Sequence, residues 1–190
     1  MIARAAGVIL GGGVIVYPTE TVYGLGASAL DLRAVQRVFR IKERPAERPI
    51  SLAVSSFEML EGVAEVSAGD LDLLRRLLPG PISVLVRKRE IVPDLLTAGS
   101  PLVGIRFPDH EIARGIIERT GPITSTSANI TGSPPPARLE DISEDITGSV
   151  DLVVDGGRCR YAEPSTLLDL SSRKILRPGA GLDVLLREIS

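Results

Sequence analysis

The sequence predicts an α/β or α+β fold in which helices flank a twisted, mixed β-sheet. Short apolar segments rich in Val and Ile alternate along the chain with segments whose apolar residues recur at helical spacing. Gly, Pro, Asp and Ser bound most of these segments, as they do at turns and helix ends. No linker-like stretch and no internal repeat interrupts the 190 residues. We therefore expect a single domain over residues 1–190.

The composition is typical of a soluble globular protein, with 44% hydrophobic and 24% charged residues. The net charge of −2 argues against wholesale electrostatic capture of nucleic acid, although it is compatible with a local basic surface. Cys159 is the single cysteine, so no intrachain disulfide can form, which is typical of a reducing compartment. The N-terminus lacks the pattern of a secretory signal, and no apolar stretch approaches the roughly 20 residues that span a bilayer. We expect a cytoplasmic protein without membrane contact.

Glycines and a helix-capping residue mark the boundaries of the first predicted elements. Residues 2–10 predict a short helix that ends at three consecutive glycines, and residues 14–17 predict a buried strand. Asp31 is a favoured N-cap for a helix that runs to about Ile41. The apolar residues of this helix recur on one face, at Leu32, Val35, Val38 and Phe39. A strand is expected next, at residues 50–54.

The same alternation continues to the end of the chain. The capping-box pattern Ser55-Ser56-Phe57-Glu58 begins one helix, and a second helix over residues 70–78 ends at Pro79-Gly80-Pro81. Asp109 is expected to cap a helix that runs to about Arg119, and residues 139–147 predict a short helix. Residues 132–136 are proline-rich and predict a mobile loop, with 132–138 as a candidate lid. The remaining strands are expected at 82–86, 102–107, from 123, and at 152–154, 166–170 and 174–176.

Several common catalytic signatures do not occur in the sequence. There is no phosphate-binding G-x-x-x-x-G-K-[ST] loop and no G-x-G-x-x-G that opens a helix. One cysteine and one histidine cannot supply zinc-ligand spacing or a convincing Ser-His-Asp triad. His110, the only histidine, falls at a predicted helix N-terminus, where we interpret it as a surface residue rather than a base.

Polar clusters follow several of the predicted strands. The strand at 14–17 ends in PTETVYG, the strand at 102–107 contains Arg106 near its end, and the strand from 123 runs into STSAN. Open α/β sheets build ligand sites at such strand ends. Because several strands of one chain end in this way, we expect the clusters to converge on one site.

The strongest chemical segment is RIKERPAERP at residues 40–49, which holds the cations Arg40, Lys42, Arg44 and Arg48. One interpretation is a solvated helix end whose cations suit the helix dipole and are partly neutralised by nearby glutamates. The other is an anion site, since Arg offers a planar fork to phosphate or carboxylate and Lys a compact charge. The hydroxyls of STSAN, with Ser125 and Ser127 on one face, allow the same two interpretations: a polar turn or a phosphate-binding segment.

These segments resemble, in order, the motifs of the YrdC-like threonylcarbamoyl-AMP synthases in their short, single-domain form. Any one motif is weak, but the ordered set covers nearly the whole chain and is specific. The resemblance implies a twisted mixed sheet with helices around a large basic cavity. The matching segments are YPTETVYGLG at 17–26, KERP at 42–45, LPGP at 78–81, GIRFP at 104–108, STSANITG at 125–132, EPST at 163–166 and RPG at 177–179.

The resemblance also implies a reaction. In this family L-threonine, bicarbonate and ATP form threonylcarbamoyl-AMP and pyrophosphate, and a separate transferase system moves the threonylcarbamoyl group to adenosine 37 of tRNA. Mg²⁺ is expected with ATP as the substrate complex, without a dedicated metal site in the protein and without a tightly bound cofactor. Two anions must meet in this chemistry, so positioned cations and donors matter more than an acid–base pair.

Site roles follow from the resemblance position by position. The nucleotide-binding and catalytic set is matched by Lys42, Arg44, Ser127 and Asn129. The threonine-binding positions are matched by Thr21, Arg106, Ser125 and Ser165, and Tyr23 is expected to add a polar-tipped apolar wall. Positions near ATP are matched by Arg48, Pro135 and Arg177.

Two positions depart from the family pattern. Arg48 stands where many members carry Asn, and Ala53 where many carry His, so the contacts of this segment are not predicted.

Two other functions are compatible with the motifs. The chain could instead be an RNA-binding module that contacts tRNA or double-stranded RNA without turnover, or a weakly active paralogue. Glu20 receives no catalytic role; we interpret it as a solvent-facing or Arg-paired carboxylate.

Overall fold

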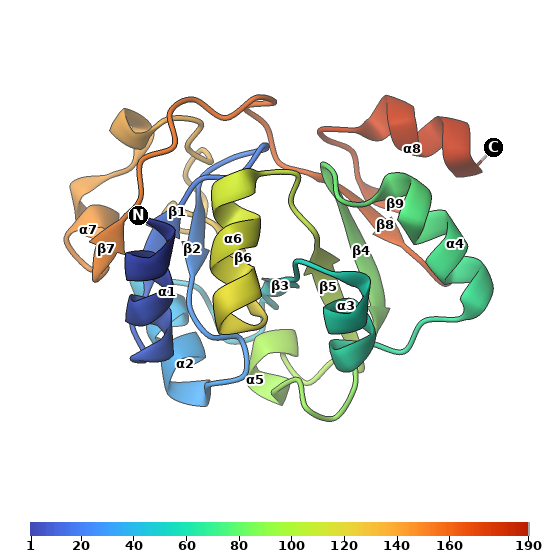
Figure 1. Cartoon of the computed structure of the whole chain (residues 1–190), viewed down its shortest axis with the longest axis horizontal. Helices are drawn as coiled ribbons and strands as arrows, with labels where there is room; N and C mark the ends of the chain where they lie inside the picture. The colour runs from blue at the N-terminus through green and yellow to red at the C-terminus, as the bar shows by residue number, and fades with distance from the viewer. Residues whose placement is uncertain (190) are drawn as a thin grey trace.

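The strands form a mixed sheet, which confirms the predicted fold class (Figure 1). The computed structural model describes residues 1–189. Within them, nine strands lie in the order β7-β1-β2-β6-β3-β5-β4-β8-β9. The strands are β1 Ile15–Tyr17, β2 Gly24–Gly26, β3 Ser51–Ala53, β4 Ile82–Arg87, β5 Leu102–Arg106, β6 Ile123–Ser127, β7 Leu152–Val153, β8 Thr166–Asp169 and β9 Ile175–Arg177. The β1/β7, β3/β5 and β4/β8 pairs are parallel, and the other neighbours are antiparallel.

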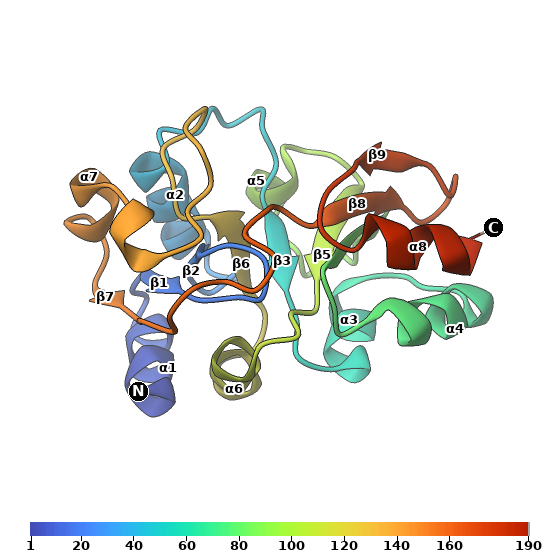
Figure 2. The same cartoon turned by 90° about the horizontal axis from the view of Figure 1, so that it is seen from above.

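Helices cover both faces of the sheet, as the view from above shows (Figure 2). The helices are α1 Ile2–Leu10, α2 Leu32–Ile41, α3 Phe57–Val63, α4 Ala68–Leu77, α5 Asp94–Thr97, α6 Glu111–Thr120, α7 Glu144–Thr147 and α8 Leu182–Ile189, with a 3-10 turn η1 at Leu139–Asp141. α1 and α6 pack together against β1 and β6, where Ala5 and Ile9 meet Ala113 and Ile116. No helix in the described residues is long and apolar enough to cross a membrane.

The helix start predicted at Asp31 is confirmed. The carboxylate of Asp31 accepts hydrogen bonds from the backbone N–H groups of Arg33 and Ala34, at 2.8 and 3.4 Å. The predicted apolar face is correct at Val35, Val38 and Phe39 but wrong at Leu32, which is 53% exposed. Leu32 is the first residue of the helix.

The prediction for the start of α6 was wrong by one residue. His110, not Asp109, occupies the N-cap position, and its side chain makes no cap hydrogen bond. Asp109 instead pairs with Arg160 at 3.0 Å. His110 is partly buried rather than a free surface residue, and burial is the main cause that lowers its pKa.

Three elements were missed, and the helix predicted over residues 139–147 is broken into η1 and α7. β2 is the sequence Gly-Leu-Gly, which has weak strand propensity. It is a strand because its backbone pairs with both β1 and β6. α5 and α8 were not predicted because α5 is a single turn and α8 follows a glycine-rich stretch near the chain end.

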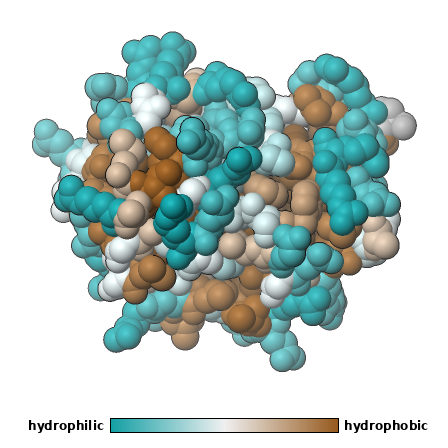
Figure 3. Space-filling model, in the orientation of Figure 1, coloured by the Kyte–Doolittle hydropathy of each residue, from teal (hydrophilic) through white to brown (hydrophobic). Residues whose placement is uncertain are grey.

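Hydrophilic and apolar side chains are mixed on the outer surface. On the face drawn in Figure 1, hydrophilic residues lie around the rim and also across the middle, between apolar ones (Figure 3). The large apolar side chains that are exposed are spread over several elements, including Leu10 of α1, Leu176 of β9 and Leu186 of α8. The polar clusters that follow the strands lie elsewhere, around a cavity.

Candidate active site

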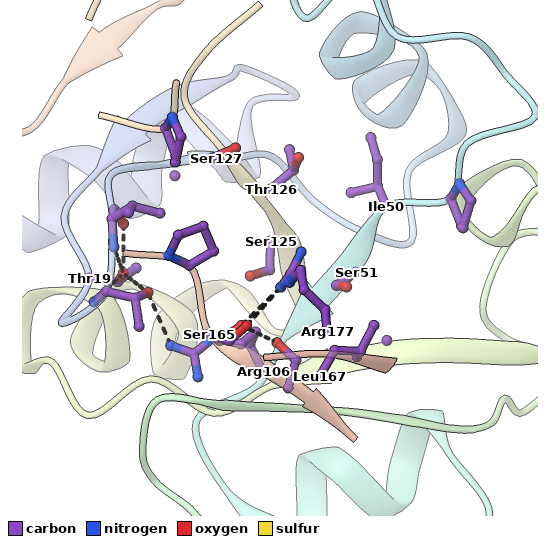
Figure 4. Close-up of a pocket in the computed structure, with 18 of the residues that line it drawn as sticks. Thr19, Ile50, Ser51, Arg106, Ser125, Thr126, Ser127, Ser165, Leu167 and Arg177 are labelled. Carbon is purple, nitrogen blue, oxygen red and sulfur yellow. Dashed lines mark hydrogen bonds between the residues drawn. The ribbon is translucent and has the colours of Figure 1, made fainter. Parts of the chain in front are cut away.

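The strand-end clusters converge on one cavity of about 550 Å³. Its walls come from the turn after β1, from β3, β4, β5 and β6, from the start of β8 and from the end of β9 (Figure 4). All the predicted site residues line it except Lys42 and Arg48. Those that line it are Thr21, Tyr23, Arg44, Arg106, Ser125, Ser127, Asn129, Pro135, Ser165 and Arg177.

The turn after β1 is built by hydroxyl groups. The Thr19 hydroxyl accepts from the backbone N–H groups of Thr21 and Val22, at 3.2 and 3.3 Å, and donates to the Val22 carbonyl at 2.7 Å. The Thr19 and Thr21 hydroxyls are 2.9 Å apart. This local network satisfies the backbone of a buried polar turn. It therefore lets the chain leave a buried strand and still place Thr21 on the cavity wall.

Glycine at position 24 allows β1 and β2 to approach closely. A Cβ atom added at Gly24 would lie 2.9 Å from Cε1 of the Tyr17 ring. The ring of Tyr17 is buried, and burial raises its pKa to about 12. The glycines of YPTETVYGLG thus serve close packing of the aromatic ring beneath the cavity.

Arg106 and Glu20 form a buried ion pair at one end of the cavity. The Arg106 Nη2 atom donates to the Glu20 Oε1 atom at 2.7 Å, and the side chains are 6% and 2% exposed. The same nitrogen reaches the Thr21 hydroxyl at 3.4 Å. The Nη1 atom donates to the carbonyls of Gly80 and Ile82. Of the two interpretations of Glu20, the Arg-paired carboxylate is the correct one.

Tyr23 contributes to the cavity wall, while its hydroxyl is engaged elsewhere. The hydroxyl lies 2.8 Å from the Gly157 carbonyl and 3.2 Å from the Asp155 carboxylate, and it accepts from the Gly156 N–H at 3.1 Å. The Tyr23 backbone N–H donates to the carbonyl of Pro136 at 2.9 Å. Tyr23 therefore ties the proline-rich loop and the 155–157 loop to the cavity wall.

Lys42 lies behind the STSAN segment. Its Nζ atom donates to the carbonyls of Ser127 and Asn129, the latter at 2.8 Å, and approaches the Asn129 side-chain oxygen at 3.5 Å. The Ser127 hydroxyl donates to that same side-chain oxygen, and the Asn129 amide donates to the Ser133 carbonyl at 2.7 Å. Lys42 thus supports the residues that line the cavity, although it does not line the cavity itself.

Burial, followed by the neighbouring charge of Arg44, lowers the pKa of Lys42 to about 7 from its ordinary value of 10.5. The folded chain therefore releases this proton at a lower pH than the unfolded chain does. Between about pH 7 and pH 10 we expect the Lys42 contribution to the free energy of unfolding to rise by up to about 1.4 kcal/mol per pH unit. Denaturant unfolding of the wild type and Lys42→Met over this range measures it. Equal slopes for the two proteins would contradict the prediction.

Arg44 reaches the cavity from the segment that follows α2. Its Nε atom donates to the Arg48 carbonyl at 3.0 Å, and its Nη2 atom donates to the Pro49 carbonyl at 2.8 Å. Arg48 itself is exposed and contributes its backbone carbonyl to this arrangement. Ala53 is buried and does not line the cavity, so neither departure from the family pattern places a side chain on the wall.

Arg177 and Ser165 lie together on the cavity wall (Figure 4). The Arg177 Nη2 atom donates to the Ser165 carbonyl at 2.9 Å and lies 3.4 Å from its hydroxyl. The Ser165 and Ser83 hydroxyls are 2.7 Å apart. Ser83, and also Ser51 of β3, line the cavity but were missed. A lone serine in an otherwise apolar strand was the signal that could have found Ser83.

Gly179 of the RPG motif is required for a close backbone approach. A Cβ atom there would lie 2.2 Å from the carbonyl oxygen of Pro164, next to Ser165. We expect Gly179→Ala to lower the free energy of unfolding by about 1–3 kcal/mol, because two backbone segments must separate. Thermal and denaturant unfolding measure this loss. Gly69→Ala in α4 is the control, since a Cβ there meets nothing within 4 Å. A Gly179→Ala protein as stable as this control would contradict the argument.

Charge in the cavity wall is carried by arginine. Among the described residues that line the cavity, Arg44, Arg106 and Arg177 are the charged ones. Burial is the main cause that lowers the pKa of Arg44 and of Arg177. No group of three or more His, Cys, Asp or Glu side chains within residues 1–189 is arranged to hold a metal ion. The site is thus suited to anionic groups that approach hydroxyls and guanidinium groups.

Comparisons with known proteins agree with this picture. The family model for Sua5, YciO and YrdC proteins, described as telomere recombination, matches residues 7–179. The threonylcarbamoyl-AMP synthase of Pyrococcus abyssi is 43% identical over 92% of this chain and 53% of its own length. That of Cellvibrio japonicus is 34% identical over 92% of this chain and 93% of its own length.

A solved structure is similar over the whole chain. It is the crystal structure of P. abyssi Sua5 complexed with L-threonine, with a TM-score of 0.94 and 42% identity, and it matches 100% of this chain and 57% of that one. The chain therefore spans about half the length of the P. abyssi protein that it matches.

Proposed function

The chain belongs to the Sua5/YciO/YrdC family, and we propose that it is a threonylcarbamoyl-AMP synthase. The observation that carries the proposal is a cavity in which three arginines meet a set of hydroxyl groups. Relatives with this name match nearly the whole chain. The proposed substrates are L-threonine, bicarbonate and ATP, and the products are threonylcarbamoyl-AMP and pyrophosphate. The product would serve tRNA N6-threonylcarbamoyladenosine formation in the cytoplasm, through a separate transferase system.

The proposed chemistry has two bond-forming stages. The neutral threonine amine attacks the carbon of bicarbonate, a C–N bond forms, the C–OH bond breaks with loss of water, and a carbamate remains. A carbamate oxygen then attacks the α-phosphorus of ATP, and the bond from that phosphorus to the bridging oxygen breaks. Pyrophosphate leaves with the electron pair. No group of the protein needs to become covalently attached, so positioning and charge stabilisation are its main contributions.

The wall residues divide into two groups by their contacts. Arg106, with Thr21 and Ser165 nearby, is the proposed partner of the threonine carboxylate. Arg44 and Arg177 are held by backbone carbonyls, and within residues 1–189 no carboxylate is among their hydrogen-bond partners, which suits binding of the ATP phosphates. Ser127 and Asn129 are proposed to bind nucleotide from the segment that Lys42 supports. Mg²⁺ would arrive with ATP and be held mainly by its phosphates.

Pyrophosphate release tests the proposal. The purified chain is incubated with ATP and Mg²⁺, and release is measured with L-threonine and bicarbonate together and with each omitted. We expect release only when both are present, and the adenylate is identified by mass spectrometry. Absence of threonine-dependent release would refute the proposal for this chain. Salt-sensitive retention of tRNA without ATP turnover would favour the RNA-binding function instead.

A further inference from the structure

Arg106 is more constrained than a free ligand-binding arginine. Its two terminal nitrogens have four partners: two backbone carbonyls, the Thr21 hydroxyl and the Glu20 carboxylate. The side chain is almost fully buried, yet it still lines the cavity. Of these four partners, Glu20 is the charged one. The orientation of the guanidinium therefore depends on a carboxylate whose removal would change the charge as well as the hydrogen bonding.

Glu20 does not line the cavity, although Thr19 and Thr21 on either side of it do. Its Oε1 atom accepts from Arg106, whereas its buried Oε2 atom has no hydrogen-bond partner among the described residues. Its carbonyl accepts from the Tyr161 N–H at 2.9 Å, and the Thr19 hydroxyl network fixes the turn around it. A buried carboxylate with one unpartnered oxygen is costly to the fold. Within residues 1–189, the side-chain hydrogen bond of Glu20 is to the arginine that faces the cavity.

We propose that Glu20 is a positioning residue that acts through Arg106 and sets the affinity of the site for L-threonine. The inference rests on the proposed function for the identity of the ligand. A charge-assisted hydrogen bond is roughly twice as strong as a neutral one, so Glu20 holds the guanidinium in one orientation before the ligand arrives. A group that is already ordered binds its ligand at a smaller entropic cost. Glu20 therefore affects threonine binding without touching threonine.

The test uses the isosteric Glu20→Gln, which keeps an acceptor oxygen and removes the charge. We expect the KM for L-threonine to rise about tenfold in Glu20→Gln, with the KM for ATP within twofold of the wild type. A merely structural loosening of the cavity would raise both. Asp109→Asn is the matched control, because it removes a nearby surface carboxylate that pairs with Arg160. The proposal is overturned if the two KM values rise together or if neither changes.

A double-variant comparison tests whether Glu20 acts through Arg106. In an Arg106→Gln background, Glu20→Gln has no arginine to orient, so we expect the threonine KM to change by less than twofold. A tenfold rise in both backgrounds would overturn the proposal, because Glu20 would then act independently.

The orientation of Arg106 is also measured without turnover. In nitrogen-15 NMR of the full chain, the guanidinium signal of Arg106, assigned by its loss in Arg106→Gln, should show slow rotation in the wild type and faster rotation in Glu20→Gln. Unchanged rotation would overturn the proposal even if the wild type showed no threonine-dependent turnover. Threonine-dependent pyrophosphate release by the wild type tests the proposed function separately.

Discussion

Arg44→Ala is expected to lower kcat for threonine- and bicarbonate-dependent pyrophosphate release by about 10²–10³-fold, equivalent to roughly 2.7–4 kcal/mol. Arg44 is a charged side chain of the cavity wall, and two backbone carbonyls fix it in place. In the proposed reaction, negative charge moves onto the departing pyrophosphate while an anion attacks. A guanidinium that is already oriented stabilises this charge without further rearrangement.

Steady-state kinetics with saturating L-threonine and bicarbonate measure the effect of Arg44→Ala on kcat and on the KM for ATP. Arg33→Ala is the control: it removes a cation from exposed α2 surface outside the cavity. The free energy of unfolding of the Arg44 variant should stay close to that of the wild type, because Arg44 makes no buried ion pair with any residue that the structure describes. Turnover close to that of the wild type would remove Arg44 from the mechanism.

The sequence predicted which segments meet at the site, but not which of their side chains line the cavity. Lys42 and Arg44 lie two positions apart, and both were assigned to the nucleotide. Lys42 is the C-cap of α2, whereas Glu43 has a φ of 48°, which redirects the chain. As a result Lys42 is buried against the STSAN segment and Arg44 reaches the cavity. Such a difference arises from a local backbone reversal, which charge patterning cannot show.

Tertiary contacts also explain what the predictions left out. Tyr23 was expected to add a polar-tipped apolar wall, but its hydroxyl bonds to residues 155–157, more than 130 positions later in the chain. Ser83 became a wall residue only because parallel pairing of β4 with β8 brings it beside Ser165. The convergence of strand ends was predictable from the motifs. The partner of each polar group depended on strand order, which the sequence pattern did not specify.

Arg106→Ala is expected to lower the free energy of unfolding by about 3–5 kcal/mol as well as to weaken the use of L-threonine. The sequence assigned Arg106 to the binding of threonine alone. The structure adds a cost to the fold, because the variant leaves the buried Glu20 carboxylate without a cation and two backbone carbonyls without a donor. Denaturant unfolding and threonine-dependent kinetics measure the two effects separately.

The double variant Glu20→Gln/Arg106→Ala distinguishes these two losses. Replacing the carboxylate removes the unpaired buried charge, so part of the lost stability should return. Threonine use should not return, because the guanidinium is still absent. A threonine KM restored together with stability would show that Arg106 acts only on the fold. A stability loss that Glu20→Gln does not reduce would show instead that the two carbonyls, rather than the carboxylate, account for the cost of removing Arg106.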